Sequence, residues 1–328
     1  MVDVGSAPPV VTASILIAAH NAAAFLDGAV SSALSQTCRT IEVVAVDDAS
    51  SDGTHDLLAA WALRDRRLTV LRHPQRRGAG AARNTAIARA RGRWLAVLDA
   101  DDAFLPERME RLVPLAEETG ADLLADNLVE RDFDTGARLG TALPPADMAS
   151  AGPVDLAAML RRDRVDLPGR SKIGYLKPIM RRDFLERSGV RYRPEIQVGE
   201  DLLFYFECVR AGACFRLAAD QALYLYSVRG GSASNQGAGA LHLSAATRRM
   251  RKLAHGLDDA ELDALLRQRQ RAADSDCFDL AIEARRPREA LRYARWADPA
   301  RVARRLGMAA GALGRRLAGG VSTRDGRP

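Results

Sequence analysis

Three carboxylates follow a run of apolar residues in the stretch 94–104, WLAVLDADDAF. Asp99, Asp101 and Asp102 lie so close together that each would have a raised pKa unless a cation neutralised them. Hard oxygen ligands suit Mn²⁺ or Mg²⁺, and such ions usually take one or two protein carboxylates plus water and substrate phosphate oxygens. The stretch therefore predicts a metal site for a diphosphate substrate. The alternative is that Asp99 and Asp102 only cap a helix that starts near Pro106.

A second pair of carboxylates, Asp47 and Asp48, ends the apolar run in VVAVDDASSDGT. A carboxylate at the end of a strand can accept the N3–H of a uracil, and it discriminates against bases that lack this donor. Asp47 and Asp48 both stand where a ligand would meet the sheet, so either could do so. The Ser, Asp and Gly residues that follow indicate a turn, with Thr54 placed to cap the next helix.

A glycine-rich segment, RRGAGAARN, begins at Arg76. Its spacing, GxGxxR, lacks the acidic residue of a dinucleotide-binding motif. The segment instead predicts a Gly/Ala loop that leads into an Ala-rich helix, with Arg83 directed at a phosphate or a base edge. The alternative is that Arg83 pairs with a neighbouring carboxylate and fastens the loop.

A later acidic pair, Glu200 and Asp201, opens the segment EDLLFYFECVRAG, which has the periodicity of a helix. Acidic residues in the first turn of a helix usually complement its dipole. A carboxylate can also accept the proton of a hydroxyl that attacks an anomeric carbon. Asp201 is the candidate for this base.

The elements that must position these residues alternate along the first 130 residues. Short apolar runs of strand length occupy 14–19, 41–47, 68–72, 94–99 and 122–126, with helical periodicity between them. This alternation predicts an α/β fold with a mostly parallel central sheet and helices on both faces. In such sheets ligands bind beyond the carboxyl ends of the strands, where both acidic clusters fall.

The composition limits the classes of protein. The chain has 328 residues, 47% of them hydrophobic, without a bilayer-spanning apolar run or a recognisable signal peptide. The four cysteines show no metal-binding or disulfide spacing, so we expect a cytoplasmic protein. Residues 241–328 hold 19 Lys and Arg against 11 Asp and Glu, while residues 1–240 carry a net charge of −2. Few aromatic residues accompany this basic segment, which argues against nucleic-acid binding.

The motifs SILIAAHN, VVAVDDASSDGT, GAARN, WLAVLDADD and VGEDLLFYFECVRAG occur in this order between residues 12 and 235. Together they resemble the inverting family 2 glycosyltransferases of the GT-A fold. The runs DADDAFLPERMERL, GYLKP and YLYSVRGGSAS are most similar to members that build bacterial exopolysaccharides, such as the succinoglycan-type transferases. The resemblance implies a catalytic domain, which we place over residues 1–240. The excess of Lys and Arg and the helical periodicity after it predict a basic helical region over residues 241–328.

The resemblance also implies the donor site. Ala18 to Asn21 and Asp48 would surround the base of a nucleotide-sugar, expected to be a UDP-sugar, and Arg83 would approach the base or the diphosphate. Where the family often has Pro and Tyr, the first strand of this chain ends in AAHN, residues 18–21, and His20 is interpreted as a packing or base-edge residue.

The implied metal and base follow from the later motifs. Asp101 would bind Mn²⁺ or Mg²⁺ against the diphosphate, Asp99 would hold the ribose or the metal, and Asp201 would be the catalytic base. Asp102 is expected only to start the next helix. Some relatives supply a further histidine ligand near residues 226–234, where this sequence has Arg229.

The acceptor is expected to be a saccharide or a lipid-linked saccharide. The polar segment 152–193 would read it, with Tyr175 placed to stack on a sugar and Lys177 to contact an acidic group, unless both serve the loop's own structure. Arg-rich residues 301–320 would lie on the inner face of the plasma membrane or pack on the catalytic domain. Two other functions stay open: a non-catalytic sugar-nucleotide-binding subunit, and a haloacid-dehalogenase-type phosphatase with Asp99 as nucleophile.

Overall fold

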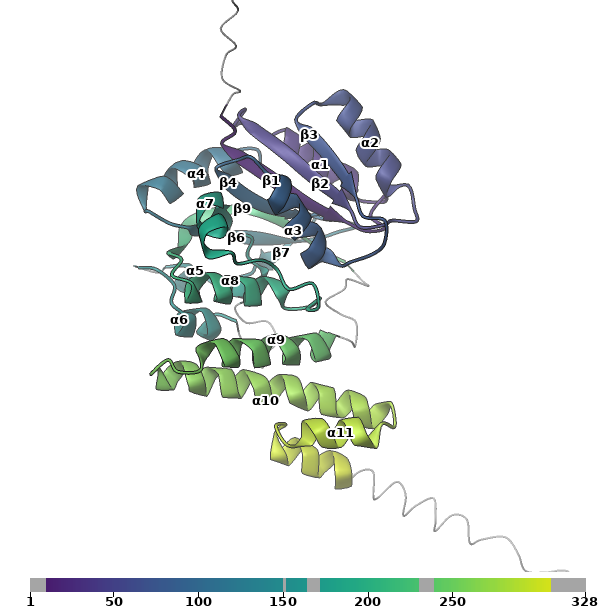
Figure 1. The fold of residues 1–328 in the computed structure, drawn as a ribbon, viewed down its shortest axis with the longest axis vertical. Coiled ribbons are helices and arrows are strands. Elements are labelled where there is room, and N and C mark those ends of the chain that lie inside the picture. Colours follow the sequence, from purple (N-terminus) through teal and green to yellow (C-terminus); the bar gives the residue numbers. More distant parts are fainter. Residues whose placement is uncertain (1–9, 150–151, 164–171, 230–238, 308–328) are drawn as a thin grey trace, which may run out of the picture.

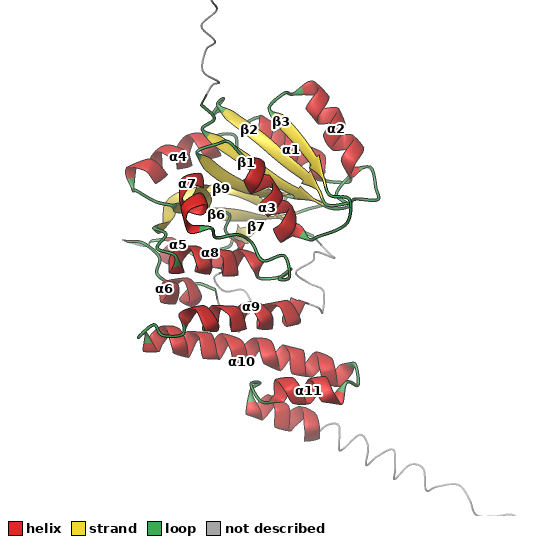
Figure 2. Cartoon of the chain, in the orientation of Figure 1, coloured by secondary structure: helices red, strands yellow, loops and turns green. Residues whose placement is uncertain are grey.

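The computed structural model describes residues 10–149, 152–163, 172–229 and 239–307. Strands and helices alternate through the first part of the chain, and helices alone form its C-terminal part (Figures 1 and 2). The strands are β1 (Ala13–Ala19), β2 (Ile41–Asp47), β3 (Leu68–Arg72), β4 (Trp94–Asp99), β5 (Ala103–Phe104), β6 (Leu123–Asp132), β7 (Arg138–Thr141), β8 (Ile179–Arg181) and β9 (Phe215–Val228). The helices are α1 (Leu26–Leu34), α2 (Thr54–Arg64), α3 (Ala79–Arg89), α4 (Arg108–Glu118), α5 (Pro145–Met148), α6 (Leu156–Arg161), the 3₁₀ turn η1 (Ile173–Tyr175), α7 (Arg182–Ser188), α8 (Glu200–Arg210), α9 (Gly239–Ala254), α10 (Ala260–Glu283) and α11 (Pro287–Ala294).

The strands form one sheet with the order β3-β2-β1-β4-β8-β6-β9-β5, and β7 pairs with β6. The half from β3 to β4 is parallel throughout. Every residue of β2 is buried, as expected for a strand covered on both faces. The alternation in the sequence therefore predicted this half of the sheet correctly.

The other half of the sheet mixes strand directions. β8 runs antiparallel to β4 and β6, whereas β6 and β9 are parallel. The short strand β8 thus joins two parallel segments and brings the residues just before it, including Lys177, next to the end of β4. The expected α/β class is confirmed, with a sheet that is parallel in one half and mixed in the other.

The register brings the predicted site together at one edge. Ala18 of β1 lies beside Asp99 of β4, and Ala19 lies beside Asp47 of β2. Because parallel strands end at the same edge, both acidic clusters emerge on one side of the sheet.

The C-terminal helices continue from the part that contains the sheet, without a separate core at their start. α9 packs on α8 and on α10, and α11 packs on α10 (Figure 1). Met250 and Leu266 belong to the same hydrophobic core as the sheet, while Phe278 and Ala290 belong to a small second cluster. The division at residues 240 and 241 stays a prediction, as does the amphipathic helix over 301–320, of which residues 308–320 lie outside the described residues.

Candidate active site

Five charged side chains meet at the carboxyl edge of the sheet: Arg83, Asp99, Lys177, Glu200 and Asp201. Arg83 Nη2 donates to Asp99 Oδ1 (2.7 Å), and its Nη1 donates to Asp201 Oδ1 (2.9 Å) and Glu200 Oε1 (3.1 Å). Lys177 Nζ lies 2.5 Å from Asp201 Oδ2 and 3.0 Å from Asp99 Oδ2. Two cations therefore bridge the predicted donor-site carboxylate and the predicted base.

Arg83 is held by helix α3 and is only 4% exposed. Its guanidinium lies 5.2 Å from the ring centroid of Tyr192, which is stacked in turn on Phe204. In this structure Arg83 pairs with carboxylates, as the alternative interpretation of this residue expected. Its partners are the predicted site carboxylates, so the pairing does not remove it from the site.

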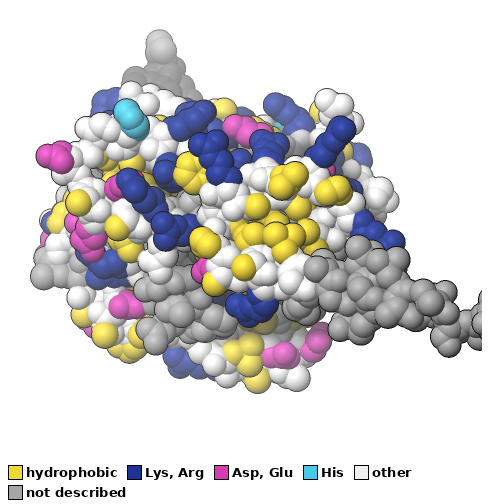
Figure 3. Space-filling model, turned by 90° about the horizontal axis from the view of Figure 1, so that it is seen from below, with side chains coloured by type: hydrophobic (Ala, Val, Ile, Leu, Met, Phe, Trp, Pro, Cys, Tyr) yellow, Lys and Arg dark blue, Asp and Glu magenta, His cyan; other side chains and the backbone are white. Residues whose placement is uncertain are grey.

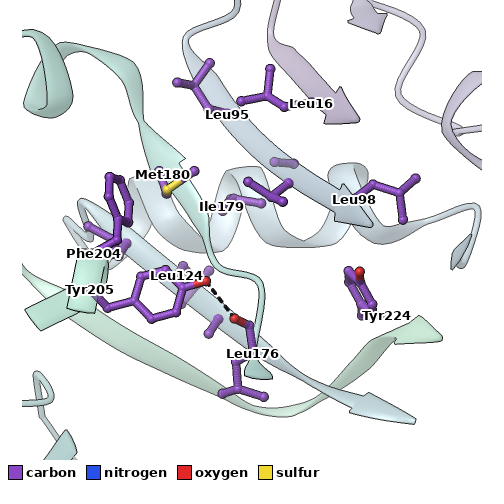
Figure 4. Close-up of a cluster of buried hydrophobic side chains, with 14 of the residues drawn as sticks. Leu16, Leu95, Leu98, Leu124, Leu176, Ile179, Met180, Phe204, Tyr205 and Tyr224 are labelled. Carbon is purple, nitrogen blue, oxygen red and sulfur yellow. Dashed lines mark hydrogen bonds between the residues drawn. The ribbon is translucent and has the colours of Figure 1, made fainter. Parts of the chain in front are cut away.

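The main chain around Lys177 is fastened from two sides. Arg108 Nη2 donates to the Lys177 carbonyl oxygen (2.5 Å) and to Asp126 Oδ1 (2.7 Å), in an ion pair whose side chains are both fully buried. On the other side, Tyr205 of α8 donates its hydroxyl to the Leu176 carbonyl oxygen (2.9 Å; Figure 4). These contacts fix the position from which the Lys177 side chain reaches the carboxylates.

Helix α8 presents Glu200 and Asp201 in its first turn, as predicted. The residue before it, Gly199, has φ +78°, a conformation that favours glycine. A Cβ there would lie 2.9 Å from Cδ2 of Leu243 in α9, so the helix start also packs tightly against the C-terminal region.

The charges shift the pKa values of the clustered groups. Burial alone would raise the pKa of Asp99, but Lys177 and Arg83 hold it well below its ordinary value. Burial would lower the pKa of Lys177, but Asp201 and Asp99 raise it above its usual range. Burial, together with the Asp201 carboxylate, raises the pKa of Glu200 to about 7. Glu200 thus titrates near neutrality, while the other two keep their charges.

Asp102 does not start the next helix. Its carboxylate accepts hydrogen bonds from the Tyr224 hydroxyl (2.7 Å) and the Ser227 N–H (2.8 Å), both in β9. Helix α4 begins six residues later, at Arg108, without a side-chain cap. The expectation for Asp102 was wrong because the loop folds back onto β9. Thr54 does not cap helix α2 either: it is the first residue of that helix, and its Oγ1 accepts from the Ala22 N–H (2.8 Å).

Asp101 pairs with Arg229, whose Nε lies 2.9 Å from Asp101 Oδ2. Among the described residues no group of three or more His, Cys, Asp or Glu is arranged to hold a metal ion. Asp99 already uses both of its oxygens on Arg83 and Lys177. These side chains do not surround a metal ion on their own. They fit an ion held by the Asp101 carboxylate and by phosphate oxygens of a substrate, which is the usual arrangement for Mg²⁺.

The predicted base-binding residues lie at different depths. Ala18 and His20 line the cavity described below. Asn21 joins two loops, because its Oδ1 accepts from the Ser51 N–H (2.9 Å). Asp48 is 2% exposed, and its carboxylate accepts from the N–H groups of Arg77 (2.9 Å) and Gly78 (2.7 Å). Asp48 thus fastens the loop before α3 in this structure, and a contact with a base stays a prediction.

A cavity of about 660 Å³ opens beside these residues. Its lining includes Ala18, Arg83, Asp99, Asp101, Lys177, Glu200, Asp201, Tyr175, Tyr226 and Arg229. The predicted metal ligand, the predicted base and both bridging cations therefore face one space.

Sequence reasoning did not assign two members of this cluster to the site. The sequence left two roles open for Lys177, contact with an acidic group while reading the acceptor or a role in the loop's own structure, and the acidic groups beside it are Asp99 and Asp201. Glu200 was regarded only as the neighbour of Asp201. The sequence signal for Lys177 is its position between apolar residues in GYLKP, directly before β8.

Comparison with known proteins identifies the family of the N-terminal part. Residues 14–148 match the model of glycosyl transferase family 2. This region is therefore similar to the family 2 glycosyl transferases. The succinoglycan biosynthesis proteins ExoO and ExoU of Rhizobium meliloti (strain 1021) are 36% and 37% identical to the chain over 222 and 224 residues. Each match covers 67% of this chain, and 62% or 63% of the relative, so the chain spans less than two thirds of their length.

Solved structures share the fold. Residues 1–349 of S. aureus TarS in complex with UDP-GlcNAc match with a TM-score of 0.62 at 20% identity, over 82% of this chain and 73% of that one. The mannosyltransferase PcManGT from Pyrobaculum calidifontis, in complex with GDP-Man and Mn²⁺, matches with a TM-score of 0.57 at 18% identity, over 92% and 86%. The predicted GT-A fold and the resemblance to succinoglycan-type family 2 proteins are confirmed.

Proposed function

We propose that the protein is a metal-dependent, inverting glycosyltransferase. It moves a sugar from a nucleotide-diphosphate donor, expected to be a UDP-sugar, to a saccharide or lipid-linked saccharide acceptor in bacterial exopolysaccharide or cell-surface glycan synthesis. The observation that carries the proposal is the shared cavity, in which Asp201 and Asp101 face the same space with Arg83 and Lys177 beside them.

The proposed reaction is a single displacement. The acceptor hydroxyl gives its proton to Asp201, and its oxygen forms a bond to the anomeric carbon. The bond from that carbon to the diphosphate breaks, and the electron pair leaves on the terminal phosphate oxygen. Arg83 and Lys177 then stabilise this oxygen, because fixed cations in a site of low dielectric act strongly on developing charge. An α-linked donor would give a β-linked product.

Asp101 would hold the metal against the diphosphate. When bound, Mn²⁺ or Mg²⁺ would supply positive charge that stabilises the leaving diphosphate. Arg229 must leave Asp101 for this to happen, or else bind the same diphosphate. Arg229 lies 4.5 Å from the ring centroid of Phe25, so it can keep one partner when it releases the carboxylate.

The relatives support the donor and the acceptor class. One Escherichia coli relative, WfaP, is named a UDP-Glc:alpha-D-GlcNAc-diphosphoundecaprenol beta-1,3-glucosyltransferase and is 35% identical over 121 residues, 37% of this chain. TarS was solved with UDP-GlcNAc. These names motivate UDP-sugars as the first donors and lipid-linked diphosphates as candidate acceptors.

We also propose a cytoplasmic location with peripheral membrane contact through the C-terminal helices. In the described ranges of the chain no helix has both the length and the apolar character needed to cross a bilayer. Leu291 and Leu306 are 74% and 52% exposed, and Trp296 lies beside the guanidinium groups of Arg251 and Arg295. Figure 3 looks onto this end of the molecule and shows hydrophobic side chains next to Lys and Arg. Apolar and basic groups together suit an anionic membrane surface.

The test of the proposed function is incubation of the full chain with a panel of nucleotide sugars and Mn²⁺. We expect release of a nucleoside diphosphate from at least one donor. A non-catalytic binding subunit would bind UDP and release nothing, and a phosphatase of the dehalogenase type would release inorganic phosphate instead.

A further inference from the structure

One wall of the cavity is built by segments outside the family 2 region. Leu243 of α9 and Arg269 of α10 line it, together with Asp163, Lys172 and Tyr175. The region that matches the family model ends at residue 148. The C-terminal helices therefore complete the cavity that contains Asp201.

Arg269 joins α10 to this wall and keeps unused donors. It is 6% exposed, and its Nη1 donates to Asp163 Oδ2 (2.6 Å) and to the Asp163 carbonyl oxygen (2.9 Å). Within the described part of the chain, Nε and Nη2 have no hydrogen-bond partner, and Nε is buried. The desolvated Nε–H favours an oxygen-rich or anionic ligand.

The same carboxylate fixes the segment that carries Tyr175. Asp163 Oδ1 accepts from the Gly174 N–H (3.1 Å). A Cβ on Gly174 would lie 3.1 Å both from this oxygen and from Cβ of Leu202 in α8. The contacts from Arg269 through Asp163 to Gly174 thus place Tyr175 relative to the start of α8.

Two aromatic rings and a lysine stand in the same cavity. The rings of Tyr175 and Tyr226 lie 5.8 Å apart at 77°, and both side chains are partly exposed. Lys172 Nζ lies 5.0 Å from the Tyr175 ring centroid, and no residue that the structure describes forms an ion pair with it. Aromatic faces with a few convergent polar groups are typical of ligand sites.

We propose that Tyr175, Tyr226, Lys172 and Arg269 form the acceptor subsite and select a saccharide that carries an anionic group. The inference rests on the proposed function, because Asp201 must take the proton of a hydroxyl presented in this cavity. The aromatic faces hold the sugar ring, and Lys172 and the unused N–H groups of Arg269 bind the anionic oxygens. The carboxylate of a uronic acid and the diphosphate of a lipid-linked sugar offer the same chemistry.

The test compares three acceptors at saturating donor: methyl glucoside, methyl glucuronide, and glucosyl diphosphate with an octyl tail. In Lys172→Gln we expect the KM of a charged acceptor to rise about tenfold, the effect of losing one charge-assisted hydrogen bond, while that of the neutral glucoside stays constant. If the KM rises only for the glucuronide, the subsite binds a carboxylate. If the KM rises only for the glucosyl diphosphate, the subsite binds the diphosphate of a lipid-linked acceptor. Lys252→Gln, on the exposed side of α9, is the matched control. The same ratio of charged to neutral KM in variant and wild type would overturn the proposal.

A binding measurement separates this inference from the proposed function. If no donor releases a nucleoside diphosphate, the proposed function fails, and saturation-transfer NMR with the same three probes still tests the subsite. Weaker binding of a charged probe to Lys172→Gln supports it, and equal binding to both proteins refutes it. Tyr175→Leu should weaken all three probes, because it removes the aromatic face, and should leave the Kd of UDP unchanged.

Discussion

Lys177 Nζ lies 2.5 Å from Asp201 Oδ2, and its second carboxylate partner, Asp99, is 3.0 Å away. The lysine thus links the end of β4 to the start of α8, two elements separated by about a hundred positions in the sequence. The charges of Lys177 and Arg83 hold the pKa of Asp99 well below its ordinary value. In the proposed reaction, the lysine cation would stabilise the leaving diphosphate, which would free Asp201 to accept a proton.

Lys177→Met should lower kcat by a factor of about 10² to 10³, since it removes a cation that stabilises developing charge. The measurement is steady-state release of UDP, with thermal unfolding as a check that the variant folds. Lys252→Met provides the control, because this lysine is exposed on α9. A folded variant with wild-type kcat would exclude Lys177 from the reaction.

Asp201→Asn should reduce transfer by a factor of about 10² to 10⁴, the usual contribution of a general base. UDP binding, measured by calorimetry, should be unchanged or tighter, because Arg83 and Lys177 lose a competing carboxylate. Asp263→Asn is the matched control, since Asp263 pairs with Arg267 on the exposed face of α10. Weakened UDP binding with normal turnover at saturation would contradict the assignment.

Asp101→Ala should raise the Mn²⁺ concentration needed for half-maximal activity. The ion would then depend on the substrate phosphates alone. Binding of Mn²⁺ in the presence of UDP, followed by electron paramagnetic resonance, provides a readout independent of turnover. Asp134→Ala, in the exposed turn between β6 and β7, should behave as wild type. Identical Mn²⁺ titrations for Asp101→Ala and wild type would remove Asp101 from the metal site.

Glu200→Gln should stabilise the protein at alkaline pH. The pKa of Glu200 is about 7 in the folded chain against an ordinary 4.5, so the folded state holds a proton that the unfolded state releases. Stability therefore falls as the pH rises from about 4.5 to about 7, and the amide removes this loss. Thermal unfolding should give a higher Tm than wild type at about pH 8 and an equal Tm at about pH 4.

The control for this prediction is Glu186→Gln, whose carboxylate is exposed on α7 and paired with Arg182. Because an exposed ion pair contributes little to stability, the Tm of this variant should stay close to that of wild type at both pH values. If the difference in Tm between Glu200→Gln and wild type were the same at both pH values, the prediction that Glu200 takes up a proton in the folded chain would be wrong.

Leu291→Glu should weaken binding of the full chain to phosphatidylglycerol vesicles, because Leu291 is 74% exposed on α11 and a carboxylate there opposes both insertion and anionic lipid. Vesicle sedimentation measures the bound fraction. Leu63→Glu is the matched control, since Leu63 is 89% exposed on α2. If the two variants sediment equally with the vesicles, or if the wild-type protein does not bind them, the proposed membrane contact of the C-terminal helices is wrong.

The sequence alone was sufficient to predict the strands that end in the acidic clusters and the helix that begins at Glu200. Apolar runs with the period of buried strands, and carboxylates directly after them, are local features that any fold of this class must satisfy. The motif order also identified the family. None of these signals depends on which distant segments come together.

Only the tertiary structure decided how the charges are shared. Lys177 belongs to the cluster because antiparallel β8 carries the residues before it to the end of β4, and no local period in the sequence specifies that pairing. Asp102 is likewise held by residues far away in the chain, because Tyr224 and Ser227 of β9 donate to its carboxylate, although its position suggested the start of a helix. The pKa of Glu200 and the contribution of Arg269 to the cavity depend on burial and on partners far away in the chain. Long-range electrostatics and packing therefore set the chemistry of residues whose types and spacing the sequence had already made conspicuous.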